Sequence, residues 1–120
     1  MLLLQRLPDG GPLYAETEFG HTIVEPWNAA SALVFVGIAL YWIWKIRDNY
    51  QDYPFIAFSL PVLMIGGIGG TLYHGLRSSV VFLYLDIGPI FGLSFAAGLY
   101  LWSRVWNKWW LFLIAAPRFL

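Results

Sequence analysis

The chain has 120 residues, of which 59% are hydrophobic and only 12% are charged, and its mean hydropathy is +0.64. Soluble domains are about 45–50% apolar and about 25% charged, so this composition excludes an ordinary water-soluble domain and indicates a membrane protein. The formal net charge of zero argues against nucleic acid as a partner, and the absence of cysteine from the sequence excludes disulfides and thiolate metal sites.

Residues 1–24 are predicted to form a polar arm outside the membrane. Proline and glycine interrupt this part of the chain, and its acidic residues are Asp9, Glu16 and Glu18. The apolar stretch at the start is about four residues long, which is too short for the core of a signal peptide, and no small-residue cleavage site follows it. We therefore expect the first hydrophobic span to stay in the mature chain.

Three hydrophobic segments follow the arm, and each is long enough to cross a membrane. They run over about residues 26–46, 54–76 and 80–102, and a helix needs about 20 apolar residues to cross the hydrocarbon core. A fourth apolar segment starts at about Trp110 and ends too soon to cross. The pattern predicts an all-α transmembrane helical bundle over residues 25–120, with three full spans and a truncated fourth. The short fourth segment indicates the N-terminal part of a larger membrane protein.

The basic residues determine the expected orientation in the membrane. The loops after the first and third spans share one side of the membrane and contain Lys45, Arg47, Arg104 and Lys108. The opposite side contains only Arg6 and Arg77. Because lysine and arginine concentrate on the cytoplasmic side, this imbalance favours a multi-pass integral membrane protein with its N-terminus outside.

Three ionisable residues are expected to lie at the membrane face of the arm. Glu25 begins the first span, His74 ends the second and Asp86 lies early in the third, so antiparallel helices bring them to one end of the bundle. A charged aspartate in hydrocarbon costs about 2.5–3.5 kcal/mol, so Asp86 needs a partner or water. His74 is the nearest expected partner, since histidine beside a carboxylate suits metal binding or proton transfer. A structural pairing of Asp86 with Arg77 is the alternative.

The acidic residues of the arm raise a second hypothesis about metals. Glu16, Glu18 and Glu25, together with Asn28, carry hard oxygen ligands, and calcium binds about six to eight oxygens. An arm that folds back on the start of the first span would bring these oxygens together. The alternative is a solvated acidic arm, and spacing alone favours that alternative.

Two short stretches carry a resemblance to a known family. The stretch "EPWNAASAL" covers residues 25–33, and the stretch "GGTLYH" is followed by an aspartate in the next helix. The first resembles the E-x-W-N-T-x-S-N stretch of alkaline ceramidases, and the second resembles their second and third helices. This family belongs to the CREST superfamily of membrane hydrolases. The resemblance covers roughly residues 14–90 and implies a seven-helix membrane hydrolase with a zinc site.

The resemblance also implies roles for individual residues. His74 matches a zinc-binding histidine, and Asp86 matches the aspartate that contacts the zinc-bound water. Glu25 matches a calcium ligand at the start of the first helix. Glu16 and Glu18 lie near the arm that supplies the other calcium ligands in the family. Calcium is therefore a second metal that the resemblance implies, beside zinc.

The chain departs from the family pattern in three respects, one of which is that the spacing from His74 to Asp86 is about one residue longer than in the family. The family usually has a serine one helical turn before the zinc histidine, whereas this chain has Gly70 there and offers the hydroxyl of Thr71 one residue later. The other zinc ligands of the family form an H-x-x-x-H pair in its last helix, but this chain contains only His21 and His74. A catalytic zinc takes about three protein ligands plus water, so the site needs ligands beyond these.

The sequence therefore predicts a zinc-dependent, ceramidase-like hydrolase that cleaves the amide bond of a lipid such as ceramide. Asp86 would act as general base, and zinc with Thr71 would stabilise the oxyanion. The expected partners are the bilayer and a membrane lipid substrate. One alternative is a small non-enzymatic membrane protein in which His74 and Asp86 form a structural or proton-sensing pair. Another is a receptor of the same superfamily.

Overall fold

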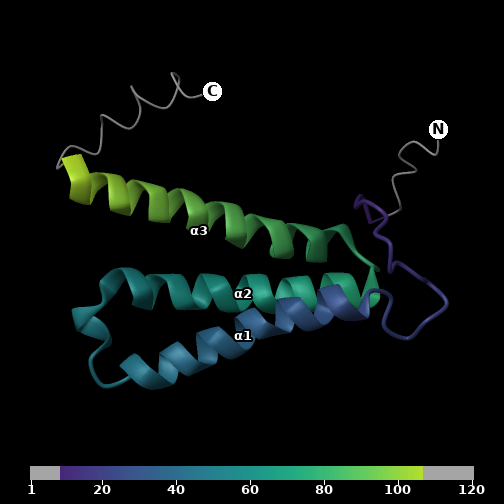
Figure 1. Ribbon diagram of the computed structural model, residues 1–120, viewed down its shortest axis with the longest axis horizontal. Coiled ribbons are helices and arrows are strands. Elements are labelled where there is room, and N and C mark those ends of the chain that lie inside the picture. Colours follow the sequence, from purple (N-terminus) through teal and green to yellow (C-terminus); the bar gives the residue numbers. More distant parts are fainter. Residues whose placement is uncertain (1–8, 107–120) are drawn as a thin grey trace. The chain divides into compact units, whose positions relative to one another are not determined.

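The computed structural model describes residues 9–106 and contains three long helices (Figure 1). Helix α1 covers Pro26–Ile46, α2 covers Pro54–Leu76 and α3 covers Val80–Trp106, with a short 3-10 helix, η1, at Tyr50–Asp52. All three long helices have the length and apolar composition needed to cross a membrane, and no strand occurs in residues 9–106. These helices confirm the all-α class and the expectation of three helices long and apolar enough to span a membrane. The predicted fourth span lies outside the described residues.

The chain divides into two compact units within α3, the first ending at Ile90 and the second beginning at Phe91. The junction between the arm and α1 lies inside the first unit. All residues of the site described below also belong to the first unit. The description that follows therefore concerns the arm, α1, α2 and the part of α3 before Phe91.

Proline and one left-handed residue define the helix ends. Pro26 and Pro54 lie in the first turns of α1 and α2, where the missing N–H removes no intrahelical hydrogen bond. Helix α2 ends at Leu76, and the next residue, Arg77, caps it. Arg77 has a left-handed φ of 46° and ψ of 36°, and its N–H donates to the carbonyl of Tyr73 at 2.7 Å. Glycine usually takes such a position because a left-handed residue with a side chain costs about 1–2 kcal/mol. The contacts of the Arg77 side chain offset this cost.

Glycines bring α2 close to both of its neighbours. A Cβ built on Gly67 would lie 2.8 Å from Cγ2 of Val36 in α1, and one built on Gly69 would lie 2.6 Å from Cβ of Leu85 in α3. At such distances the backbone of α2 is in direct contact with both helices. Small residues at helix contacts are typical of membrane bundles, where close van der Waals packing drives association.

Gly69→Ala is expected to lower the stability of the first unit by about 1–3 kcal/mol, the usual cost of overpacking. The added Cβ would meet backbone atoms of Leu85 at 2.7 and 2.8 Å, and a backbone cannot rotate away as a side chain can. The free energy of unfolding in mixed micelles would measure the effect. Gly37→Ala is the matched control, because a Cβ there meets nothing within 4 Å. Equal losses in the two variants would contradict this account of the packing.

Large apolar side chains face outward along the helices. In α1 and α2 the exposed ones include Leu33, Val34, Phe35, Ile38, Leu40, Phe58, Ile65 and Ile68. Such a surface suits lipid and not water, because exposed apolar area of this extent is unfavourable in a soluble protein. Composition, helix length and surface together support a multi-pass membrane protein.

Candidate functional site

The arm reaches the end of α2 through backbone hydrogen bonds. The N–H of Val24 donates to the carbonyl of Gly75, and the N–H of Glu25 donates to the carbonyl of His74, both at 3.0 Å. The last carbonyls of a helix have no partner within the helix, so the arm satisfies two of them. This pairing places the side chain of Glu25 beside that of His74.

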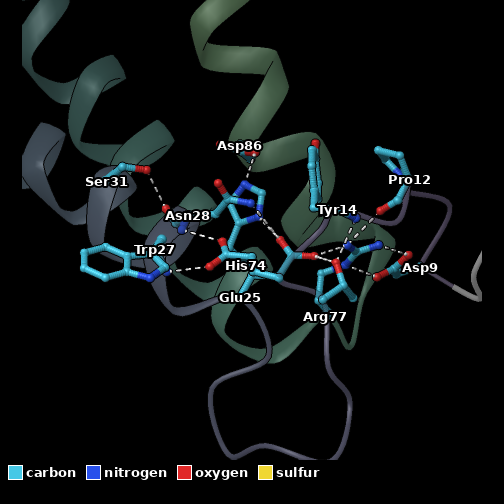
Figure 2. A network of polar contacts seen from close by, with 12 residues as sticks. Asp9, Pro12, Tyr14, Glu25, Trp27, Asn28, Ser31, His74, Arg77 and Asp86 are labelled. Carbon is cyan, nitrogen blue, oxygen red and sulfur yellow. Dashed lines mark hydrogen bonds and ion pairs between the residues drawn. The ribbon is translucent and has the colours of Figure 1, made fainter.

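Glu25 is the centre of the site (Figure 2). Its side chain is fully buried, and each carboxylate oxygen contacts two nitrogen or hydroxyl groups. Oε1 accepts hydrogen bonds from the hydroxyl of Thr17 at 2.6 Å and from Nη1 of Arg77. Oε2 lies 2.5 Å from Nδ1 of His74 and accepts from Nδ2 of Asn28 at 3.3 Å. A buried carboxylate is stable only when it is both paired and hydrogen-bonded, and Glu25 meets both conditions.

The carboxyl groups around Arg77 are held in the charged form. Burial alone would raise the pKa of Glu25, but hydrogen bonds from the four surrounding side chains outweigh burial and lower it. The pKa of Asp9 is also lowered, mainly by the hydrogen bond from the side chain of Arg77. Both groups are therefore carboxylates at neutral pH, and the arm is attached to the helices by charged hydrogen bonds.

Acid is expected to destabilise the docked arm. Asp9 and Glu25 have ordinary pKa values of 3.8 and 4.5, and both values are lowered in the folded state. Their contribution is complete at pH values above the ordinary ones and is lost as the pH falls through the lowered ones. The thermal unfolding midpoint should therefore fall more steeply below pH 4.5 in the wild type than in Asp9→Asn, which has one such group fewer. Identical pH dependence in both proteins would refute the prediction.

His74 connects Glu25 with Asp86. Its Nδ1 faces Glu25, while its Nε2 lies 3.5 Å from Oδ2 of Asp86. The rings of Tyr14 and Tyr73 contact the imidazole edge-on, at centroid distances of 5.7 and 4.9 Å. Each ring nitrogen of His74 therefore faces a carboxylate oxygen, and either nitrogen can donate a hydrogen bond when it carries a proton. The side chain of Asp86 is 19% exposed, so this end of the site is partly open.

Gly70 makes room for Asp86. A Cβ built on Gly70 would lie 2.5 Å from Oδ1 of Asp86, so a serine at this position would collide with the carboxylate. The hydroxyl of Thr71 donates to the carbonyl of Gly67 at 2.7 Å, one turn back along α2. Within residues 9–106 it makes no hydrogen bond to His74 or Asp86. The predicted oxyanion role of Thr71 therefore stays a prediction that no contact supports.

The predicted calcium ligands have other partners in the structure. Glu25 is surrounded by the donors described above, and Glu16 accepts hydrogen bonds from two N–H groups in the first turn of α1 at 2.9 and 2.8 Å. Glu18 is exposed and lies 3.8 Å from Nε2 of His21. Asn28 donates to Glu25. In the part of the chain that the structure describes, no group of three or more histidine, aspartate or glutamate side chains is arranged to hold a metal ion.

Glu16 instead caps α1 from the arm. Its carboxylate accepts the N–H groups of Trp27 and Asn28, which have no partner within the helix. Glu16→Ala is expected to lower the free energy of unfolding by about 0.5–2 kcal/mol, the usual cost of a lost N-cap. Glu18→Ala, at an exposed position of the same loop, should change it much less. Equal changes would show that Glu16 does not cap the helix.

Sequence analysis does not assign Asp9 or Thr17 to this site, and it names Arg77 only as an alternative partner of Asp86. The alternative partner expected for Asp86 was Arg77, but the Arg77 side chain pairs with Asp9 and Glu25. Asp9 and Arg77 are 68 positions apart, and no periodicity relates a loop residue to a helix end over such a separation. One signal was available: Arg77 follows the second predicted span, at the same membrane face as the acidic arm.

No protein-family model, curated protein or solved structure matches the chain.

Proposed function

We propose that this chain provides part of a zinc-dependent, ceramidase-like membrane hydrolase that cleaves the amide bond of a membrane lipid such as ceramide. One observation carries the proposal: a buried carboxylate, Glu25, holds Nδ1 of His74, while Nε2 faces the carboxylate of Asp86. Histidine ligands of zinc almost always donate their second ring N–H to a carboxylate, a carbonyl or water, and this contact fixes the ring. The ceramidase resemblance assigns His74 to zinc and Asp86 to the zinc-bound water.

In this mechanism His74 and Asp86 have separate roles. A bound zinc would supply a water with a pKa of about 7. Glu25 keeps the Nδ1 proton on His74, so the lone pair of Nε2 is free to act as one zinc ligand. Asp86 accepts the proton of the attacking water as its oxygen adds to the amide carbonyl, and returns that proton to the departing amine. The remaining zinc ligands would come from a second polypeptide or a second copy of this chain, since about three protein ligands are needed and residues 1–8 and 107–120 contain no histidine, cysteine, aspartate or glutamate.

The position of the site suits a lipid substrate. Glu25 directly precedes α1, His74 lies in the last turn of α2 and Asp86 lies in the second turn of α3, so the site lies where these three apolar helices begin or end. The headgroup of a lipid lies at this depth and its chains lie along the apolar helix surfaces. With the N-terminus outside, as the basic residues favour, the site would face the outer leaflet.

A proton-sensing pair without catalysis is the second candidate. His74 lies between two carboxylates, and an imidazolium there would be stabilised by both without any metal. This function predicts that chelators have no effect. It also predicts that His74→Gln removes a response to pH and not an enzymatic activity.

Hydrolysis of a fluorescent ceramide by the purified protein in micelles tests the proposal. Chelation should abolish turnover and added zinc should restore it. His74→Gln should reduce turnover at least about 100-fold, because the chain would lose a zinc ligand. His21→Gln is the matched control, since His21 is the other histidine and is exposed in the arm. Turnover that survives chelation or His74→Gln would overturn the proposal, and zinc binding without any turnover would favour a receptor.

A further inference from the structure

Four oxygen atoms surround the guanidinium of Arg77 (Figure 2). Nε donates to Oδ2 of Asp9 at 2.7 Å, and Nη2 donates to Oδ1 of the same carboxylate at 3.2 Å. Nη1 donates to the carbonyl of Pro12 at 2.8 Å and to Oε1 of Glu25. The Arg77 side chain is 0% exposed. The arm, the start of α1 and the end of α2 therefore meet around a single buried positive charge.

The surroundings of the guanidinium are closely packed. The ring of Tyr73 lies against it, with the guanidinium carbon 4.8 Å from the ring centroid. A Cβ built on Gly11 would lie 1.6 Å from the hydroxyl of Tyr73 and 3.1 Å from Nη2 of Arg77. The N–H of Gly11 donates to Oδ1 of Asp9 at 3.0 Å, which fixes that carboxylate. A second cation could not enter this space unless the guanidinium left it.

The oxygens around Arg77 are of the kinds that calcium binds. They comprise two carboxylates, from Asp9 and Glu25, and the backbone carbonyl of Pro12, and calcium sites are built from carboxylates, carbonyls and water. Here the guanidinium of Arg77 donates hydrogen bonds to all three groups, and its positive charge strengthens the hydrogen bonds to the two carboxylates. Glu25, the residue for which the resemblance implies calcium, is thus already satisfied by a cation of the chain itself.

We propose that the guanidinium of Arg77 takes the place of calcium at Glu25, so that the arm docks onto the helices without a divalent cation. Arg77 is then a positioning residue: it holds the carboxylate of Glu25, which in turn contacts Nδ1 of His74. This inference concerns the docking of the arm and does not depend on the proposed hydrolase activity. It implies a latent cation site, because removing the guanidinium leaves the oxygens of Asp9, Pro12 and Glu25 facing one another.

The thermal unfolding midpoint of the full chain in detergent micelles tests the proposal. The wild type should have the same midpoint in EGTA and in millimolar calcium. Arg77→Ala should lower the midpoint in EGTA by about 10 °C or more, since it leaves two carboxylates without their buried partner. Millimolar calcium or guanidinium should raise the midpoint of Arg77→Ala, while sodium chloride of equal ionic strength should not. Arg47→Ala is the control, because Arg47 forms an exposed pair with Asp48.

Two results would overturn the proposal. One is a wild-type midpoint that falls in EGTA and recovers with calcium. The other is an Arg77→Ala protein whose midpoint responds to neither calcium nor guanidinium. If Arg77→Ala does not fold, Asp9→Asn provides the second variant, since it keeps both Arg77 and Glu25. Its midpoint should fall equally in EGTA and in calcium, and a midpoint that depends on calcium would count against the proposal.

Discussion

Glu25→Gln is expected to lower the free energy of unfolding by about 3–5 kcal/mol, the usual cost of breaking a buried ion pair. The substitution preserves the shape of the side chain but removes its charge, so the buried guanidinium of Arg77 keeps only Asp9 as an ionised partner. In glutamine an N–H₂ group also replaces one carboxylate oxygen. This group would face side chains that now donate hydrogen bonds to Glu25. Unfolding in mixed micelles, followed by loss of helix, would measure the change.

An exposed ion pair supplies the control for this variant. Arg47 and Asp48 lie 3.5 Å apart with side chains 59% and 89% exposed, and such pairs contribute about 0–1 kcal/mol. Asp48→Asn should therefore have little effect. If Glu25→Gln changes stability no more than Asp48→Asn does, Glu25 does not hold the arm and helices together.

Asp86→Asn is expected to reduce kcat for ceramide hydrolysis about 100- to 10,000-fold, the range typical of a lost general base. An amide cannot accept a proton from water at neutral pH, whereas its shape still fits beside Nε2 of His74. KM and the amount of bound zinc should be nearly unchanged, because Asp86 is proposed to act on the water and not to bind the lipid.

Asp52→Asn, in the exposed turn η1 at the other end of α2, is the matched control and should leave kcat unchanged. Two outcomes would revise the role of Asp86. Retained turnover would exclude it as the base, and a parallel loss of zinc would identify it as a ligand.

The helices of this chain are predictable from local physical rules. Apolar length, the prolines at positions 26 and 54 and the polar turn before Val80 locate α1, α2 and the start of α3. Because successive membrane helices are antiparallel, the same rules place Glu25, His74 and Asp86 at one end of the first unit, where the structure has them in contact. The predicted third span was shorter than α3, since the interfacial residues Ser103 and Arg104 continue the helix.

The role of the arm was not predictable in the same way. Its contacts join positions separated by 52 and 68 residues and depend on the left-handed conformation of Arg77 at the end of α2. Helical periodicity carries no information about such pairs. The acidic residues of the arm were compatible with a calcium site or with a solvated arm, and spacing favoured the solvated arm. In the structure a side chain of the chain itself supplies the cation, and composition does not predict this.

Zinc binding by His74 is the property on which the proposed hydrolase depends most. We would measure the zinc bound per chain at equilibrium in micelles for the wild type, His74→Gln and His21→Gln. We expect the wild type and His21→Gln to bind zinc and His74→Gln to lose it. Equal zinc binding by all three proteins, or none by the wild type, would contradict this expectation and leave the contacts of His74 with Glu25 and Asp86 as a metal-free ion-pair network.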